Sequence, residues 1–389
     1  MGISIESRRG RAALMAAHCA GLVDLVALPV WVGTLVSRYG FDPQQAGGLA
    51  TLFLLGVVLA GAVFAPLFHR LSGRWVASLG FGVSAVGFWL AAGVTAFADM
   101  AVLHALCGVA TGAALSMTHG TAARSAHPHR LFAMMGTALG VFAIAFLAAT
   151  PQLIDAVGGP ALFYAFAASM GLAGVVALLA FPSANAVVSS DNGPKAVPQP
   201  VPPAVWAGIV GIAFMALVQA MTFSMLERVG ADRGFDRAAI NGVLIALGLV
   251  NLLPAALAAL LEKRWPARHV LLAGPVVQAT LCAVVMVSPV FPPYAVAAAL
   301  FASAMIFTHT FAFGLLARLD PSGRSLAASP AMMMIGSAIG PVLGGTLVKG
   351  YGYEALAVVA AGLAMVAVFC FSRLPSEAAT SATGREVLA

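Results

Sequence analysis

The chain has 389 residues, of which 61% are hydrophobic and only 9% are charged, and its net charge is +6. A soluble domain carries roughly 25% charged residues, so this composition excludes an ordinary soluble protein. The basic excess could suit nucleic acid, but it lies in short loops between long apolar runs. That arrangement favours a membrane protein that contacts the lipid bilayer and binds no nucleic acid.

The first apolar run follows Arg8, Arg9 and Arg11 and continues to Arg38, which is too long for the core of a cleaved signal peptide. It therefore predicts a first membrane span. A spanning helix needs about 20 mostly apolar residues, and it satisfies its own backbone hydrogen bonds in the bilayer. We expect an all-α membrane protein with twelve transmembrane helices, at roughly 12–36, 44–68, 75–97, 100–122, 131–154, 161–182, 203–226, 238–261, 270–288, 293–316, 325–348 and 354–372.

The longest polar interruption, 183–202, is rich in Pro, Ala, Val and Ser and divides the spans into two sets of six. It predicts a flexible linker between six-helix bundles at 1–182 and 203–375, with a disordered tail at 376–389. Fifteen of the twenty Lys and Arg residues fall on the side that holds the N-terminus. Because basic loops stay in the cytoplasm, we expect both termini there, in a bacterial cytoplasmic membrane.

Several positions recur at a constant offset of 194 residues. Gly40-Phe41-Asp42 returns as Gly234-Phe235-Asp236, and four arginines return as well: Arg70, Arg74, Arg124 and Arg130 as Arg264, Arg268, Arg318 and Arg324. Basic loops alone would give some arginine matches, but they would not give the constant offset. A duplicated hydrophobic unit is typical of a transporter built from two pseudo-symmetric halves.

Two six-span halves, a central cytoplasmic linker and basic loops after spans two and eight resemble the major facilitator superfamily over nearly the whole chain. The resemblance implies two bundles that rock about a central site, and we expect a monomer without cofactor or metal. Residues 66–75 keep the Gly-Arg end of the family motif G-x-L-x-D-R-x-G-R-R but lack its acidic residue. The motif and its counterpart loop imply a cytoplasmic gate: Arg70, Gly73, Arg74, Glu262, Arg264 and Arg268.

Span eleven contains a second motif, G-x-x-x-G-P-x-x-G-G, which resembles one that antiporters of the family carry in span five. Its occurrence in the other half favours close helix packing over antiport, because small residues let helices approach each other. The packing residues are Gly336, Gly340, Pro341, Gly344 and Gly345.

Asp24 is the only one of the fourteen acidic residues that lies in the middle of a span. An ionisable group in the bilayer is costly and indicates function. A carboxyl held near neutrality can load and release a proton, so we predict proton coupling at Asp24, with His309 as the second candidate. The alternative is a neutral carboxyl that hydrogen-bonds a neighbouring helix.

Four histidines also lie within spans, where imidazole can both donate and accept hydrogen bonds. For each of them a packing role is the alternative. The resembled fold would place them, with several polar residues, on spans that line the cavity, and Gln278 is the exception. The predicted substrate-binding residues are His18, His104, Thr111, His119, Gln219, Asn241, Asn251 and His309.

These features favour a secondary transporter that a proton gradient drives. The chain contains no G-x-x-x-x-G-K-[ST] loop for ATP, and its four cysteines have no metal-site spacing. One hypothesis is efflux of small amphipathic compounds, as in the drug-efflux branch, since no Lys or Arg lies mid-span. The other is proton-linked uptake of a small organic acid or other nutrient. An enzyme or a sensor is disfavoured, because no nucleophile–base arrangement is present.

Overall fold

The computed structural model describes residues 3–68, 70–183, 202–262, 264–320 and 324–375. Within these ranges the chain is helical and contains no β-strand. Twelve helices of the described chain are long and apolar enough to cross a membrane. The predicted all-α fold with twelve spans is therefore confirmed.

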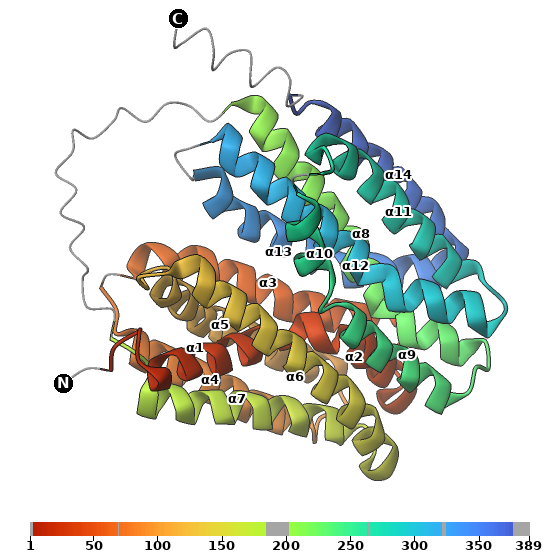
Figure 1. Ribbon diagram of the computed structural model, residues 1–389. Helices are drawn as coiled ribbons and strands as arrows, with labels where there is room; N and C mark the ends of the chain where they lie inside the picture. Colours follow the sequence, from red (N-terminus) through yellow and green to blue (C-terminus); the bar gives the residue numbers. More distant parts are fainter. Residues whose placement is uncertain (1–2, 69, 184–201, 263, 321–323, 376–389) are drawn as a thin grey trace, which may run out of the picture. The chain divides into compact units, whose positions relative to one another are not determined.

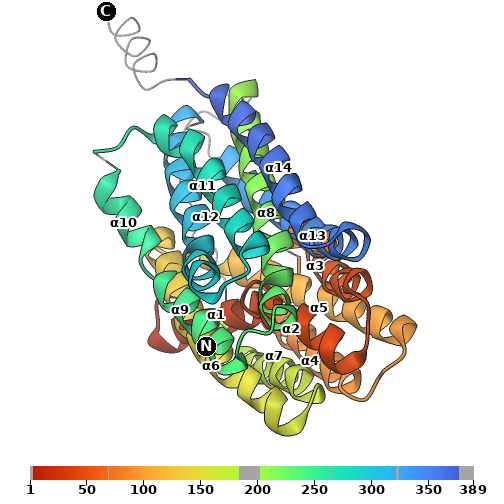
Figure 2. The same ribbon diagram turned by 90° about the vertical axis from the view of Figure 1, so that its right-hand side faces the viewer.

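The chain divides into two compact units (Figures 1 and 2). The first comprises Met1–Pro194 with Pro341–Thr346, and the second comprises Lys195–Gly340 with Leu347–Ala389. The sequence does not predict that Pro341–Thr346 belongs to the first unit. The predicted linker, apart from Ser183 and Pro202, and the whole predicted tail lie outside the described residues.

The first unit contains seven helices from the six predicted spans, because the first span is broken. They are α1 (Arg8–Gly21), α2 (Val23–Tyr39), α3 (Pro43–Leu67), α4 (Gly73–Ala91), α5 (Phe97–Ala122), α6 (Pro128–Val157) and α7 (Pro160–Ala180).

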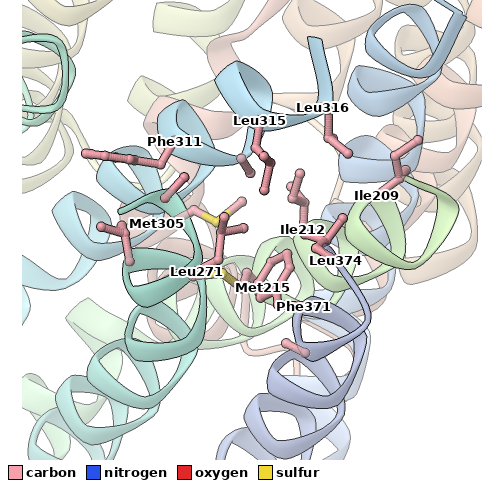
Figure 3. Packing of buried hydrophobic residues seen from close by; sticks show 14 of the residues in the cluster. Ile209, Ile212, Met215, Leu271, Met305, Phe311, Leu315, Leu316, Phe371 and Leu374 are labelled. Carbon is pink, nitrogen blue, oxygen red and sulfur yellow. The ribbon is translucent and has the colours of Figure 1, made fainter. Parts of the chain in front are cut away.

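The second unit also has seven helices, because the eighth span is broken. They are α8 (Pro203–Asp232), α9 (Arg237–Val250), α10 (Pro254–Leu261), α11 (Ala267–Val287), α12 (Phe291–Leu319), α13 (Arg324–Tyr351) and α14 (Glu354–Ser372). Part of its core is a cluster of buried apolar side chains from α8, α11, α12, α14 and the residues just after α14, as Figure 3 shows: Ile209, Ile212, Met215, Leu271, Met305, Phe311, Leu315, Leu316, Phe371 and Leu374.

Each break lies within one of the predicted spans, a detail that the sequence analysis does not address. In the first span the backbone of Leu22 has φ −114° and ψ 24°, outside the helical region, and Pro29 further along cannot donate to the carbonyl of Leu25. In the eighth span Pro254 begins α10 and cannot donate to the carbonyl of Val250, which accepts instead from the N–H of Leu253 at 3.0 Å. Figure 2 shows α10 as a separate helix that follows α9. Hydropathy cannot reveal such breaks, because the side chains stay apolar.

The repeated Gly-Phe-Asp sequence builds the same turn in both units. Gly40 ends α2 with φ 72°, and Gly234 has φ 73°, a left-handed backbone that glycine adopts without steric cost. Asp42 accepts a hydrogen bond from the N–H of Gln45 at 2.9 Å and caps α3. Asp236 accepts one from Ala239 at 2.9 Å and caps α9. The sequence repeat is therefore a chain reversal followed by a helix start.

Glycines bring α3 and α5 into backbone contact. A Cβ added to Gly108 would lie 2.1 Å from the carbonyl oxygen of Phe53, and one on Gly112 would lie 2.5 Å from that of Val57. On the facing helix, a Cβ on Gly56 would lie 2.8 Å from the carbonyl of Ala105. This Gly56–Gly108–Gly112 contact is hereafter the glycine seam. Any side chain there would force the two helices apart.

In the second unit, α13 approaches α8 in the same way. A Cβ on Gly336 would lie 2.2 Å from the carbonyl oxygen of Ala213, and one on Gly340 would lie 2.6 Å from the backbone nitrogen of Met221. The first two glycines of the span-eleven motif thus serve close helix packing.

Polar contacts fix helix ends within each unit. Glu6 accepts a hydrogen bond from the N–H of Ala126 at 2.8 Å and pairs with Arg11 at 2.6 Å. The bond from Ala126, followed by that from Arg11, holds the pKa of Glu6 below its ordinary value. In the second unit, Tyr353 donates to Asp232 at 2.5 Å. Burial, followed by this neighbouring carboxylate, raises the pKa of Tyr353.

Candidate functional site

Asp24 lies in the first turn of α2, directly after the break at Leu22, and only 3% of it is exposed. Its Oδ1 atom is buried and has no hydrogen-bond partner within the described part of the chain. A buried polar atom without a partner is costly, so it requires a functional or solvent explanation. The N–H groups of a first helical turn favour a nearby negative charge.

His18 on α1 and His119 on α5 form a side-chain pair. Nδ1 of His18 lies 3.0 Å from Nε2 of His119, and the ring centroids are 5.2 Å apart. One nitrogen must donate and the other must accept, so the tautomers of the two rings are linked. His119 also contacts the ring of Phe132 on α6, at 5.8 Å between centroids. The sequence marks both histidines but cannot pair them, because 101 residues separate them.

We expect His18→Phe and His119→Phe to destabilise the protein by about 1–3 kcal/mol each, because each leaves the other imidazole without its partner. The double substitution should cost less than the sum of the two, since it removes both polar groups together. Thermal unfolding of the purified protein measures all three changes. Strictly additive effects would show that the pair contributes no coupling energy.

His104 on α5 belongs to an aromatic cluster of the first unit. Its ring lies 5.4 Å from that of Trp31 and 5.7 Å from that of Phe163, between centroids. Nδ1 lies 2.7 Å from the carbonyl oxygen of Met100, so Nδ1 carries the proton and Nε2 is left as an acceptor in the neutral ring. Nε2 of His104 and Nε1 of Trp31 are both buried without a partner among the described residues. Nε2 of His104 can accept a hydrogen bond, and the Nε1–H group of Trp31 can donate one.

Thr111 on α5 is fully buried and contacts side chains of α4 and α7. Its hydroxyl is 2.9 Å from Oγ of Ser84 and 3.9 Å from the sulfur of Met170. On α5, His104, Thr111 and His119 share one helix face with Gly108 and Gly112. Because the two glycines belong to the glycine seam, this face combines different roles.

Gln219 on α8 pairs with Gln278 on α11. Nε2 of Gln278 donates to Oε1 of Gln219 and to the carbonyl of Met215, each at 3.1 Å. Gln278 is only 1% exposed. Its placement in span nine was the exception in the sequence pattern, and this hydrogen bond explains it.

The break in the eighth span also carries a polar contact. Asn251 ends α9, and its Oδ1 accepts from Oγ of Ser303 on α12 at 3.3 Å. Asn241 lies half-buried on α9. His309 on α12 is half-buried, with Nδ1 3.0 Å from the carbonyl of Met305 and its ring 5.2 Å from that of Phe313. Asp24 and His309 belong to different units, so neither unit by itself joins the two predicted proton sites.

The predicted gate residues lie at helix ends. Arg70 and Arg74 are exposed, and Gly73 begins α4 where a Cβ would lie 2.9 Å from the ring of Phe181. In the counterpart loop, Glu262 and Arg264 are exposed and Arg268 is half-buried. In the span-eleven motif, Pro341, Gly344 and Gly345 lie on α13.

No group of three or more His, Cys, Asp or Glu side chains suited to a metal ion occurs in the described ranges. Within each unit, polar side chains on facing helices contact one another: His18 with His119 in the first unit, and Gln219 with Gln278 and Asn251 with Ser303 in the second.

Solved structures similar to this chain are transporters. The nucleoside transporter NupG has a TM-score of 0.70 and 15% identity, covering 94% of this chain and 98% of that chain. A bacterial homolog to the human lysosomal transporter Spinster, inward-facing and occupied, has a TM-score of 0.69 and 14% identity, covering 95% of each chain. At such identities the likeness shows the fold alone.

No curated protein matches the sequence. The family model described as Major Facilitator Superfamily matches residues 13–325, which is most of the chain. This chain belongs to the Major Facilitator Superfamily.

Proposed function

We propose that the protein is a proton-coupled secondary transporter of a bacterial cytoplasmic membrane that exports small amphipathic compounds by alternating access. Membership of the family supports transport of a small molecule rather than enzymatic chemistry. The observation that carries proton coupling is the buried Oδ1 of Asp24, which has no partner in the described chain and follows a break in its span. Discontinuous spanning helices form substrate and ion sites in many transporters.

Efflux of amphipathic compounds is favoured by the charges and surfaces around the candidate residues. No Lys or Arg lies in the middle of a span, so no permanent cation is available for an organic anion. The aromatic rings of Trp31, Phe88 and Phe163 surround His104, so the surroundings of this candidate residue are apolar. A proton carried on Asp24 in one direction could then exchange for a neutral or cationic compound moving in the other.

Uptake of a polar nutrient is the second candidate. The hydrogen bonds of Gln219 with Gln278 and of Asn251 with Ser303 place amide groups on facing helices of the second unit. Such groups suit a neutral polar substrate, because amides both donate and accept. Among the similar structures, NupG is described as a nucleoside transporter.

Transport into vesicles of defined orientation separates the two candidates. With an acidic lumen, inside-out vesicles should accumulate a cationic amphipathic dye, because protons leaving the lumen exchange for dye. Vesicles without the protein correct for passive trapping of the dye, and a protonophore should abolish the signal. Accumulation of a nucleoside in right-side-out vesicles with an acidic exterior would support uptake instead. Gradient-independent transport in both orientations would refute proton coupling.

A further inference from the structure

Two arginines of the repeated set, Arg124 and Arg318, belong neither to the predicted gate nor to the predicted substrate site. Arg124 follows α5 directly, and its guanidinium carbon lies 4.7 Å from the ring centroid of Phe68, at the end of α3. The face of an aromatic ring attracts a cation within about 6 Å of its centroid. This contact therefore joins the ends of two helices that lie side by side in the first unit (Figure 1).

The ring of Phe68 also rests against the backbone of α5. A Cβ added to Gly120 would lie 2.6 Å from Cδ2 and 2.7 Å from Cε2 of this ring. The N–H of Arg124 donates to the carbonyl of Thr121 at 3.1 Å, which continues the last turn, so Gly120 and Arg124 lie one turn apart on the same face. Phe68 and Arg124 are both half-buried, and a cation–π contact is stronger where water is partly excluded.

Phe68 stands at the start of the loop between α3 and α4, which contains half of the predicted gate. It is the first residue after α3, and Arg70, Gly73 and Arg74 follow within six positions. At the other end of the loop, a Cβ on Gly73 would lie 2.9 Å from the ring of Phe181. The loop is thus attached at both ends. The contact at Phe68 needs no acidic residue, and residues 66–75 contain none.

The second unit repeats this arrangement with a different side chain. The offset of 194 residues relates Phe68 to Glu262, and it relates the glycine and the arginine at the end of α5 to Gly314 and Arg318. Oε1 of Glu262 would lie 4.0 Å from a Cβ on Gly314, and Nε of Arg318 donates to the carbonyl of Gly314 at 3.3 Å. The repeat therefore keeps the glycine and the arginine, and it places a carboxylate where the first unit has a ring.

We propose that Arg124 is a positioning residue of the predicted cytoplasmic gate, which holds the loop between α3 and α4 against α5 through the ring of Phe68. The attachment stands on the contact itself, whereas its part in transport rests on the proposed function. A loop attached at both ends follows the helices that it joins. A detached loop would reach its closed position less often, so each transport cycle would take longer.

Hydrogen exchange of the purified full chain, followed by mass spectrometry, tests the attachment. The N–H groups of Arg70 and Val76 donate to the carbonyls of Leu67 and Ser72 at 2.9 and 3.0 Å, so they report whether the loop is held. Arg124→Gln should speed exchange of the peptide that covers the loop by about twofold to fivefold, as loss of a cation–π contact implies. Arg124→Lys keeps a cation and should exchange nearly as slowly as the wild-type protein.

A side chain borrowed from the second unit makes the test sharper. Phe68→Glu introduces the carboxylate found at the equivalent position, so an ion pair with Arg124 should replace the ring contact. We expect slow exchange of the loop in this variant at low salt and faster exchange at about 1 M salt, where the Debye length is about 3 Å. Combined with Arg124→Gln, it should exchange fast at both salt concentrations. Exchange in Phe68→Glu that does not depend on Arg124 would overturn the proposal.

Arg373→Gln is the matched control. The guanidinium of Arg373 lies 4.4 Å from the ring centroid of Phe369, so the substitution removes the same kind of contact within a single helix end, that of α14. Exchange of the loop between α3 and α4 should not change in this variant.

Transport of ethidium, a cationic amphipathic dye, in oriented vesicles tests the part in gating. Arg124→Gln should lower the maximal rate several-fold and leave KM unchanged, because neither Phe68 nor Arg124 is a predicted substrate-binding residue. Unchanged loop exchange in this variant would overturn the attachment, and faster exchange with an unchanged rate would overturn the gating role. Wild-type vesicles that move no dye would refute the proposed efflux instead, while the exchange result would still decide the attachment.

Discussion

Replacing Asp24 by Asn should abolish accumulation driven by a pH gradient while leaving substrate exchange measurable. Asn has nearly the same shape but cannot bind and release a proton, so the carrier would cycle with substrate alone. A difference of one pH unit is worth about 1.4 kcal/mol per proton, or about tenfold accumulation for each coupled proton. The measurement is accumulation of labelled substrate in oriented vesicles at several imposed gradients. We expect the variant to show none beyond the substrate's own gradient.

Two further variants make this test specific. Asp99→Asn removes an exposed carboxyl from the first turn of α5 and should behave like the wild-type protein. Asp24→Glu keeps a titratable group and should keep part of the coupling. If Asp24→Asn accumulates substrate as the wild-type protein does, Asp24 has no coupling role and its burial serves packing alone.

Replacing Gly108 by Ala should strongly destabilise the first unit. The added methyl would lie 2.1 Å from the carbonyl oxygen of Phe53, so α3 and α5 must separate along the glycine seam. Forcing extra volume into a close-packed contact costs about 1–3 kcal/mol and occasionally more. A lower melting temperature and loss of monodisperse protein after heating would report the change.

Gly136→Ala is the matched control, because a Cβ on this exposed glycine of α6 meets no atom within 4 Å. In a helix, Ala is more favourable than Gly by up to about 1 kcal/mol, so this variant should be neutral or more stable. The two substitutions are chemically identical and are expected to differ in sign. A Gly108→Ala variant as stable as the control would show that the seam can relax at no cost.

Much of the fold can be predicted from the sequence because a bilayer restricts what the chain can do. The apolar runs mark the spans, and the repeated Gly40 and Asp42, as Gly234 and Asp236, mark a turn whose chemistry is local. The breaks at Leu22 and before Pro254 could not be predicted with the same certainty. A proline in an apolar run permits a break, but packing of neighbouring helices decides whether one forms.

The side-chain pairs were beyond sequence reasoning for a different reason. A stripe on one helix shows which residues share a face, but it does not show which helix lies opposite. His18 and His119 are therefore separate candidates in the sequence, and only the hydrogen bond that Gln219 accepts from Gln278 explains the polar residue in span nine. The roles of Asp24, of the histidines and of the gate arginines in transport stay predictions.

The glycine seam has a mechanical consequence for the first unit. Where α3 and α5 meet backbone to backbone, no side-chain rotamers lie between Gly56, Gly108 and Gly112 that could rearrange to let one helix slide past the other. We therefore expect the two helices to move together as one rigid body. If the first unit bends, we expect bending where a helix is already interrupted, as at Leu22. Because Asp24 occupies the next turn, the break in the first span and its ionisable group are the same few residues.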